Sequence, residues 1–271
     1  LETYTPETLN QSFLIVALIA LALGLIGLFK LEPRSAAAPG SDAENYTWLQ
    51  MFKVLSSNKQ VSRFFWYLLL LLTAILGQDI LLEPYGAEAF GLSVQATTRI
   101  TSIWGTFFLI SLSLGAAMER KVSKIVQAKI GAYTGILAFF LIVVSGAGGM
   151  LSLFYTGVVL LGFATGLSTV SNLSLMLDMT TVGSVGLFIG AWGMASALAR
   201  LTGNLLSGVL RESFTPLLNS SVGGYNAVFI FEIFILIVSL LILRGVDVSL
   251  FQKQSEQSLS YLERAAISNE V

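Results

Sequence analysis

The 271-residue chain contains no cysteine and no histidine, and only 11% of its residues are charged. Without cysteine, disulfide bonds and thiolate chemistry are excluded. Without histidine, the chain lacks the usual proton relay and the commonest protein ligand for metals and haem iron. About a quarter of the residues of a soluble domain are typically charged, so the low charge argues against a soluble protein.

Long runs without Asp, Glu, Lys or Arg occupy much of the sequence, over residues 13–29, 100–118, 130–177 and 179–199. A membrane-spanning helix needs about 20 predominantly apolar residues. The third run is long enough for two such helices, and its Gly-rich segment SGAGG predicts a turn at 145–149. The sequence therefore predicts an all-α polytopic membrane protein.

We expect about seven transmembrane helices, at residues 13–29, 64–82, 99–118, 128–147, 151–176, 184–209 and 227–243. Of the 15 Lys and Arg residues, twelve fall in the loops on one side, two on the other, and Arg200 lies within a span. Lys and Arg are enriched in cytoplasmic loops, so the N-terminus is predicted outside and the C-terminus inside.

The spans divide the chain into one helix in residues 1–30, a linker, a six-helix bundle over 63–245 and a cytoplasmic tail over 246–271. The linker at 31–62 is predicted to be cytoplasmic and flexible, with a short interfacial amphipathic helix in TWLQMFKVL. Spans two to four and five to seven predict two inverted three-helix repeats, as in many secondary transporters. The odd number of spans predicts that the chain begins partway through a larger fold.

Three ionisable residues, Asp79, Arg200 and Glu232, are expected in the outer third of the membrane. Such residues are costly in lipid, so we predict one intramembrane ion cluster, which either fixes helix packing or belongs to a functional site. Small and polar residues recur at helical spacing in the sixth span, and this face is predicted to point into the bundle: Gly183, Gly186, Gly190, Gly193, Ala197, Arg200, Asn204 and Ser207. The GxxxG pairs Gly162/Gly166 and Gly186/Gly190 are predicted to pack helices.

One loop, LGAAMERKVSKI at 114–125, places Gly115, Glu119, Arg120 and Lys124 between the third and fourth spans. It resembles the Gly-x-x-x-Asp-Arg-x-Gly-Arg/Lys loop of the major facilitator superfamily, with Glu for Asp and without the second Gly. In that superfamily the loop follows the second helix of each six-helix half. The resemblance implies a helical bundle of that type, with residues 1–30 as the last helix of an otherwise missing amino-terminal half.

Two further stretches narrow the resemblance: GQDILLEPYGAEAFGLSVQATTRITSIWG at 77–105 and LMLDMTTVGSVGLFIGAWGMASALAR at 175–200. They resemble the PucC-type bacteriochlorophyll/chlorophyll delivery branch of the superfamily. The similarity covers residues 60–245, the carboxy-terminal half. It implies a non-enzymatic factor that assists assembly of light-harvesting or photosystem complexes by handling chlorophyll or bacteriochlorophyll, with carotenoid or lipid as further ligands.

The resemblance also directs attention to the turn after the second span. We expect Gln78, Asp79 and Glu83 to form a polar rim where a pigment, lipid or partner helix docks. Chlorophyll magnesium is a hard cation that accepts oxygen ligands, and without histidine the candidate axial ligands are a backbone carbonyl, water, or the side chains of Gln78, Asn172, Asn204 and Glu232. The alternative is a site that stabilises the bundle without binding pigment.

Two other functions are compatible with the sequence. One is a lasting structural subunit of a photosystem or antenna; the other is a secondary transporter of the major facilitator type. An enzyme is not expected, because no nucleophile–base pair, metal cluster or phosphate loop is recognisable. The net charge of −1 does not suggest nucleic acid. The expected location is a cellular thylakoid membrane, or alternatively a purple-bacterial intracytoplasmic membrane.

Overall fold

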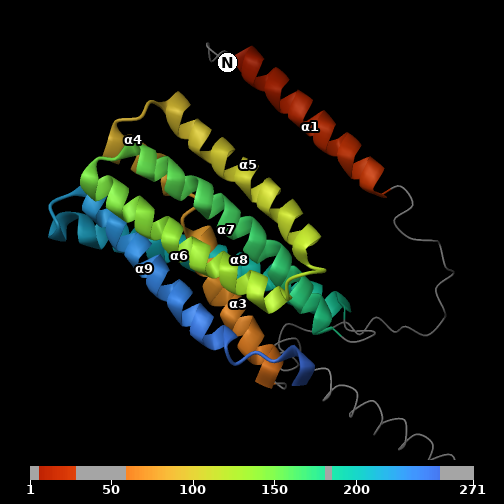
Figure 1. Cartoon of the computed structure of the whole chain (residues 1–271). Helices are drawn as coiled ribbons and strands as arrows, with labels where there is room; N and C mark the ends of the chain where they lie inside the picture. The colour runs from red at the N-terminus through yellow and green to blue at the C-terminus, as the bar shows by residue number, and fades with distance from the viewer. Residues whose placement is uncertain (1–5, 29–58, 181–184, 251–271) are drawn as a thin grey trace, which may run out of the picture. The chain divides into compact units, whose positions relative to one another are not determined.

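A computed structural model describes residues 6–28, 59–180 and 185–250 (Figure 1). The chain divides into two units, Leu1–Asn45 and Tyr46–Val271, and each is described by itself. The described part of the first is the helix α1 (Pro6–Leu28), whose residues 13–26 are all exposed. The predicted amphipathic helix at 47–55 and most of the predicted tail lie outside the described residues.

The second unit is a bundle of helices, and its described part contains no strand. Its elements are α3 (Lys59–Gly77), α4 (Leu82–Phe90), α5 (Val94–Met118), α6 (Lys124–Gly148), α7 (Leu151–Asp178), α8 (Val185–Leu217) and α9 (Ser221–Leu243). Within the described residues, α3, α5, α6, α7 and α9 are long and apolar enough to cross a membrane. The prediction of an all-α polytopic membrane protein is confirmed, while the seven-span count and the orientation stay predictions.

Helix ends differ most from expectation around the second predicted span. Helix α3 begins at Lys59, earlier than predicted, and ends at Gly77, so that Gln78 and Asp79 lie in a turn rather than in a helix. The short α4 was not predicted from the sequence, and it contains Pro84. Pro is tolerated in a first turn, where its missing N–H has no intrahelical partner to lose, and Pro84 is the third residue of α4.

The predicted turn in the long apolar run is confirmed. Helix α6 ends at Gly148 and α7 begins at Leu151. Between them Gly149 adopts a left-handed conformation with φ 64°, which glycine reaches without steric cost. The tight connection makes α6 and α7 antiparallel neighbours, which pack along their lengths.

Helix packing agrees only in part with the predicted inverted repeats, which stay a prediction. If α3, α5 and α6 form one triplet and α7, α8 and α9 the other, the first helix of each packs on the second and third of the other. Thus α3 packs on α8 and α9, and α7 packs on α5 and α6, while the third helices α6 and α9 pack on each other (Figure 1). Exchange of the two triplets preserves these contacts, but α8 also packs on α9, whereas α5 and α6 have no comparable contact in the described bundle.

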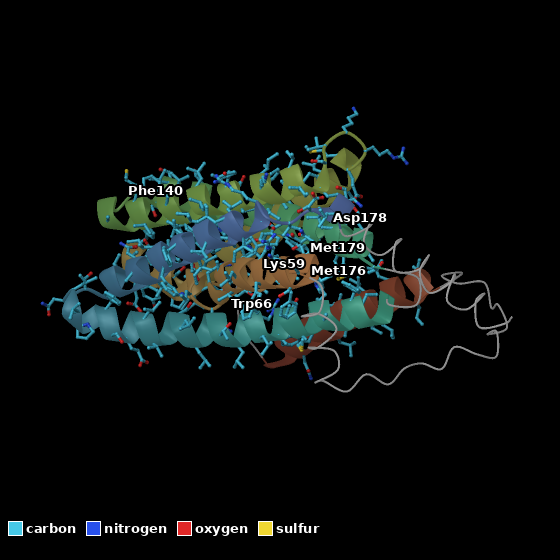
Figure 2. All side chains as sticks on the ribbon, turned by 90° about the horizontal axis from the view of Figure 1, so that it is seen from below. Lys59, Trp66, Phe140, Met176, Asp178 and Met179 are labelled. Atoms are coloured by element: carbon cyan, nitrogen blue, oxygen red, sulfur yellow. The ribbon has the colours of Figure 1, made fainter. Side chains whose placement is uncertain are left out.

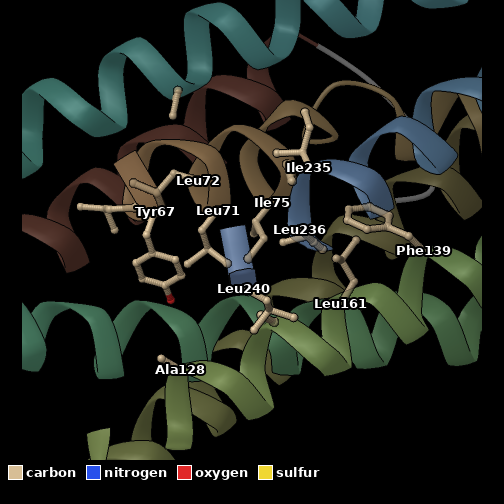
Figure 3. Close-up of a cluster of buried hydrophobic side chains, with 14 of the residues drawn as sticks. Tyr67, Leu71, Leu72, Ile75, Ala128, Phe139, Leu161, Ile235, Leu236 and Leu240 are labelled. Atoms are coloured by element: carbon tan, nitrogen blue, oxygen red, sulfur yellow. The ribbon is translucent and has the colours of Figure 1, made fainter. Parts of the chain in front are cut away.

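The core lies between α3, α6, α7 and α9, where Tyr67, Leu71, Ile75, Phe139 and Leu236 are buried (Figure 3). The helices approach closely at glycines. A side chain on Gly162 would meet the Trp104 carbonyl, and one on Gly166 would meet the Phe108 carbonyl. This GxxxG pair therefore packs α7 against α5, as predicted.

Candidate functional site

The turn after α3 buries one side chain of the predicted rim and leaves the next partly exposed. Gln78 is 1% exposed, and its Nε2 donates to the Ile75 carbonyl at 3.2 Å and to Asp79 Oδ1 at 3.3 Å. The Gln78 Oε1 atom is buried without a hydrogen-bond partner among the described residues. The side chain of Asp79 is 27% exposed. Gln78 thus faces the bundle interior and Asp79 its surface.

The predicted ion pair between Asp79 and Arg200 is present. Arg200 Nη1 donates to Asp79 Oδ2 at 3.3 Å, which links the end of α3 to the middle of α8. The Arg200 side chain is 60% exposed, so this pair lies on the surface of the described bundle. Partly exposed pairs in water contribute little, about 0–1 kcal/mol, to stability.

The prediction that the Arg200 face of α8 points into the bundle is wrong for the part up to Arg200, whereas Asn204 and Ser207 of the same predicted face do lie inward. Gly186, Gly190, Gly193 and Ala197 are exposed along with Arg200. The inward face carries Phe188, Ala191, Ala195, Ala199, Gly203 and Ser207. Small residues thus line two sides of α8 at helical spacing, and periodicity does not distinguish between them. The pair Gly186/Gly190 consequently packs no helix of the described bundle.

The third member of the predicted cluster, Glu232, lies inside the bundle on α9. It is 2% exposed, and neither carboxyl oxygen has a hydrogen-bond partner in the described part of the chain. A methyl group placed on Gly77 would lie 3.4 Å from Glu232 Oε1 and 3.1 Å from Gly203 Cα. Glu232 therefore lies where α3, α8 and α9 meet, beneath the surface pair and without a cation of its own.

Asn204 adds another unpaired oxygen near this junction. It follows Gly203 in α8, and its Oδ1 is buried without a partner among the described side chains. Gln78 in the turn after α3, Asn204 in α8 and Glu232 in α9 thus contribute unpaired acceptors near one crossing of the described helices. Buried acceptors without donors are destabilising, so this junction is a strained polar site.

We expect Glu232→Gln to raise the free energy of unfolding by about 1–3 kcal/mol, because it removes an unpaired buried acceptor and supplies an N–H donor. The measurement is thermal unfolding of the full chain in mild detergent. Asp79→Asn is the comparison and should lower stability by no more than about 1 kcal/mol, the worth of a partly exposed pair. A Glu232→Gln variant less stable than Asp79→Asn would contradict this interpretation.

Two other predicted site residues lie away from this junction. Glu83, in the first turn of α4, accepts a hydrogen bond from Thr101 of α5, so it fastens α4 to α5. Asn172 is 1% exposed in α7, and its Nδ2 donates to the Ser168 carbonyl at 2.7 Å. Asn172 lies near Tyr67, although neither Tyr67 Oη nor Asn172 Oδ1 has a hydrogen-bond partner among the described residues. Tyr67 lies eleven residues, or about 16 Å along the helix, before Gln78. The structure does not join Glu83 or Asn172 to the other candidates.

A second network, around Glu88 of α4, was not predicted from the sequence. Glu88 Oε1 accepts from Arg211 Nη2 and from Tyr225 Oη, each at 3.0 Å. The Arg211 guanidinium also lies 4.4 Å from the centre of the Tyr225 ring. This network ties α4 to α8 and α9. Of these residues, only Arg211 entered the sequence-based prediction, as one of the two cations in the loops predicted to lie outside.

The loop between α5 and α6 forms a compact cluster at the opposite end of the bundle. Lys124 Nζ lies 2.7 Å from Asp178 Oδ1 and 3.4 Å from Glu119 Oε1. A hydrogen bond from Ser174, reinforced by the Lys124 charge, lowers the pKa of Glu119. Gly115 is buried against Leu167 and Val170 of α7, whereas Arg120 is exposed. Lys124 and Gly115 of the motif therefore attach the loop region between α5 and α6 to the end of α7, where Asp178 lies (Figure 2).

The helices, their charge-poor cores and the intramembrane polar junction define a polytopic α-helical membrane protein. Comparison with known families matches residues 1–251 to the family described as PUCC protein. The chain belongs to that family.

Relatives from purple bacteria support the same assignment. The chain is 29% identical over 255 residues to "Protein PucC" of Rhodobacter capsulatus, covering 89% of this chain and 54% of that protein. It is 27% identical over 256 residues to an uncharacterized protein of the puhA-bchM intergenic region of the same organism, covering 88% and 52%. It is also 29% identical over 216 residues to "Bacteriochlorophyll synthase 44.5 kDa chain" of Rhodobacter capsulatus, covering 76% and 49%. The chain spans about half the length of these relatives.

Proposed function

We propose that this protein is a non-enzymatic assembly factor of a photosynthetic membrane, handling chlorophyll or bacteriochlorophyll and holding antenna or photosystem polypeptides during assembly. The proposal rests on membership of the PUCC family and on the names of the purple-bacterial relatives. The host membrane is a thylakoid or an intracytoplasmic membrane of the purple-bacterial kind.

The observation that carries the proposal is the exposed face of α8. Gly186, Gly190, Gly193 and Ala197 line one side of this helix and lead to the exposed Arg200. Small residues allow another transmembrane helix to approach closely, and an interfacial charge fixes its position along the axis. We infer that this small-residue face of α8 docks a helix of a nascent pigment-binding polypeptide.

The buried oxygens do not fit a chlorophyll macrocycle. A methyl group on Gly77 would already lie 3.1 Å from Gly203 Cα, so a flat ring has no room beside Gln78 or Glu232 while α3 and α8 are packed. Asn172 is equally enclosed, at 1% exposed. We therefore assign none of these residues to the magnesium, and pigment carried by this protein would lie on an exposed surface.

The test is purification of the tagged full chain from its photosynthetic membrane in mild detergent, with absorption spectroscopy and mass spectrometry of what accompanies it. We expect chlorophyll or bacteriochlorophyll together with substoichiometric antenna or photosystem polypeptides. The double variant Gly190→Leu/Gly193→Leu should lower polypeptide recovery at least tenfold, which corresponds to a loss of ~1.4 kcal/mol in binding free energy. Ile237→Phe, on the exposed face of α9, is the control for added bulk and should leave recovery unchanged.

Other outcomes identify the competing functions. A fixed one-to-one ratio to a mature complex would make the protein a structural subunit. A colourless preparation without photosynthetic polypeptides would overturn the proposal and favour a transporter. Equal losses of polypeptide recovery in the α8 double variant and in Ile237→Phe would show that the small-residue face of α8 does not dock a polypeptide.

A further inference from the structure

A groove of about 620 Å³ lies at the end of the bundle where α3 begins and α9 ends. Helix α3 contributes four residues at positions i, i+3, i+4 and i+7, which share one helix face: Lys59, Ser62, Arg63 and Trp66. The opposite wall is Leu241, Ile242 and Gly245 from the end of α9. None of these residues belongs to the polar junction at the far end of α3.

The charges at the mouth of the groove are available to a ligand. Lys59 is exposed and forms no ion pair with any described residue. Arg63 uses Nη1 to donate to the Gly245 carbonyl at 3.0 Å, which orients its guanidinium at the groove. Asp247 lies two residues after Gly245, and its Oδ1 accepts hydrogen bonds from Ser249 Oγ and from the Leu250 amide. The mouth is therefore cationic.

The groove changes from charged to apolar along the helix axis. Trp66 lies seven residues beyond Lys59, about 10 Å further into the bundle, and its side chain is 55% exposed (Figure 2). Leu241 precedes Gly245 by one helical turn and lines the same deeper part of the groove. Tryptophan is enriched at the level of lipid headgroups, where one side of its ring is apolar and its N–H is wet.

We propose that this groove binds an anionic membrane lipid, with the phosphate or sulfate of the headgroup on Lys59 and Arg63 and an acyl chain along Trp66 and Leu241. Two cations beside a hydroxyl match an anionic headgroup, as basic pockets between transmembrane helices do. The apolar inner part of the groove favours a lipid over a soluble phosphate, because a soluble phosphate would make no contact with Trp66 and Leu241. The lipid would fasten the start of α3 to the end of α9.

The test uses the purified full chain and native mass spectrometry with added phosphatidylglycerol or phosphatidylcholine of identical chain length. We expect phosphatidylglycerol to be retained at least tenfold better, and glycerol 3-phosphate not to displace it. Lys59→Gln/Arg63→Gln should abolish that preference. Arg120→Gln/Lys121→Gln removes the same charge from the exposed α5–α6 loop and should keep it.

Arg63 also holds Gly245, so the double variant risks a folding defect. Lys59→Gln alone is then the decisive variant, since Lys59 forms no ion pair with a described residue, and it should reduce the preference severalfold. Trp66→Ala should weaken retention of both lipids without changing charge. Equal retention of the two lipids, displacement by glycerol 3-phosphate, or an equal loss in the loop variant would each overturn the proposal.

Discussion

Tyr85→Ala should destabilise the bundle by about 3–5 kcal/mol, the usual cost of truncating a buried aromatic residue. The Tyr85 side chain is fully buried and contacts four aromatic rings, those of Phe90, Phe154, Tyr225 and Phe229. It belongs to α4 and, together with the hydrogen bond between Glu88 and Tyr225, attaches α4 to α9. Thermal unfolding in detergent, followed by circular dichroism, measures the loss.

Two further variants separate the causes. Tyr85→Phe keeps the ring but removes the hydroxyl bonds to the Ile142 carbonyl at 2.8 Å and to Asn226 Oδ1 at 3.1 Å. Because the hydroxyl has a single proton, the two acceptors share one donated hydrogen bond, and its loss should cost about 0.5–1.5 kcal/mol. Tyr133→Ala removes a tyrosine that is mostly exposed on α6 and should cost less than about 0.5 kcal/mol. Equal costs for the Ala variants at Tyr85 and Tyr133 would contradict the packing described.

Gly203→Leu should be similarly damaging, at about 3 kcal/mol or more, because it forces a side chain between two backbones. A methyl group there would lie 2.7 Å from the Thr73 carbonyl oxygen and 2.8 Å from Gly77 Cα. Backbone atoms inside packed helices do not move aside as flexible side chains do. A loss of 3 kcal/mol corresponds to a fall of roughly 6–12 °C in melting temperature for a domain of this size.

The matched control is Gly208→Leu on the same helix. A methyl group on Gly208 has no atom within 4 Å among the described residues. Both substitutions add the same bulk and gain the same helix propensity, so their difference isolates the contact of α8 with α3. If Gly208→Leu unfolds at the lower temperature, the α3–α8 crossing is not as the structure describes it.

The sequence identified the residues of the predicted ion cluster but not how they are arranged. Asp79, Arg200 and Glu232 attract notice in sequence because ionisable residues are rare among apolar runs. Their pairing depended on which side of α8 faces the bundle, and two small-residue faces compete on that helix. The prediction of a single buried cluster therefore became a surface ion pair above an unpaired carboxylate.

The Glu88 network was missed for a related reason. Its residues come from α4, α8 and α9, and Glu88 is separated from Arg211 and from Tyr225 by more than 120 residues. A short helix containing a proline also gives no periodic signal from which its neighbours can be predicted. Only the folded chain brings this acid beside Arg211 and Tyr225.

The sequence by itself determined the class of protein, the approximate helices and the α6–α7 turn. These follow from local physics, since charge-free runs, helical spacing and glycine turns act over short distances along the chain. The tertiary structure alone decided which face of α8 is buried, where Glu232 lies and how Lys59, Trp66 and Leu241 form one groove. Those outcomes depend on contacts between helices that are distant in sequence. When one side of a helix packs in the core, its opposite side must face outward.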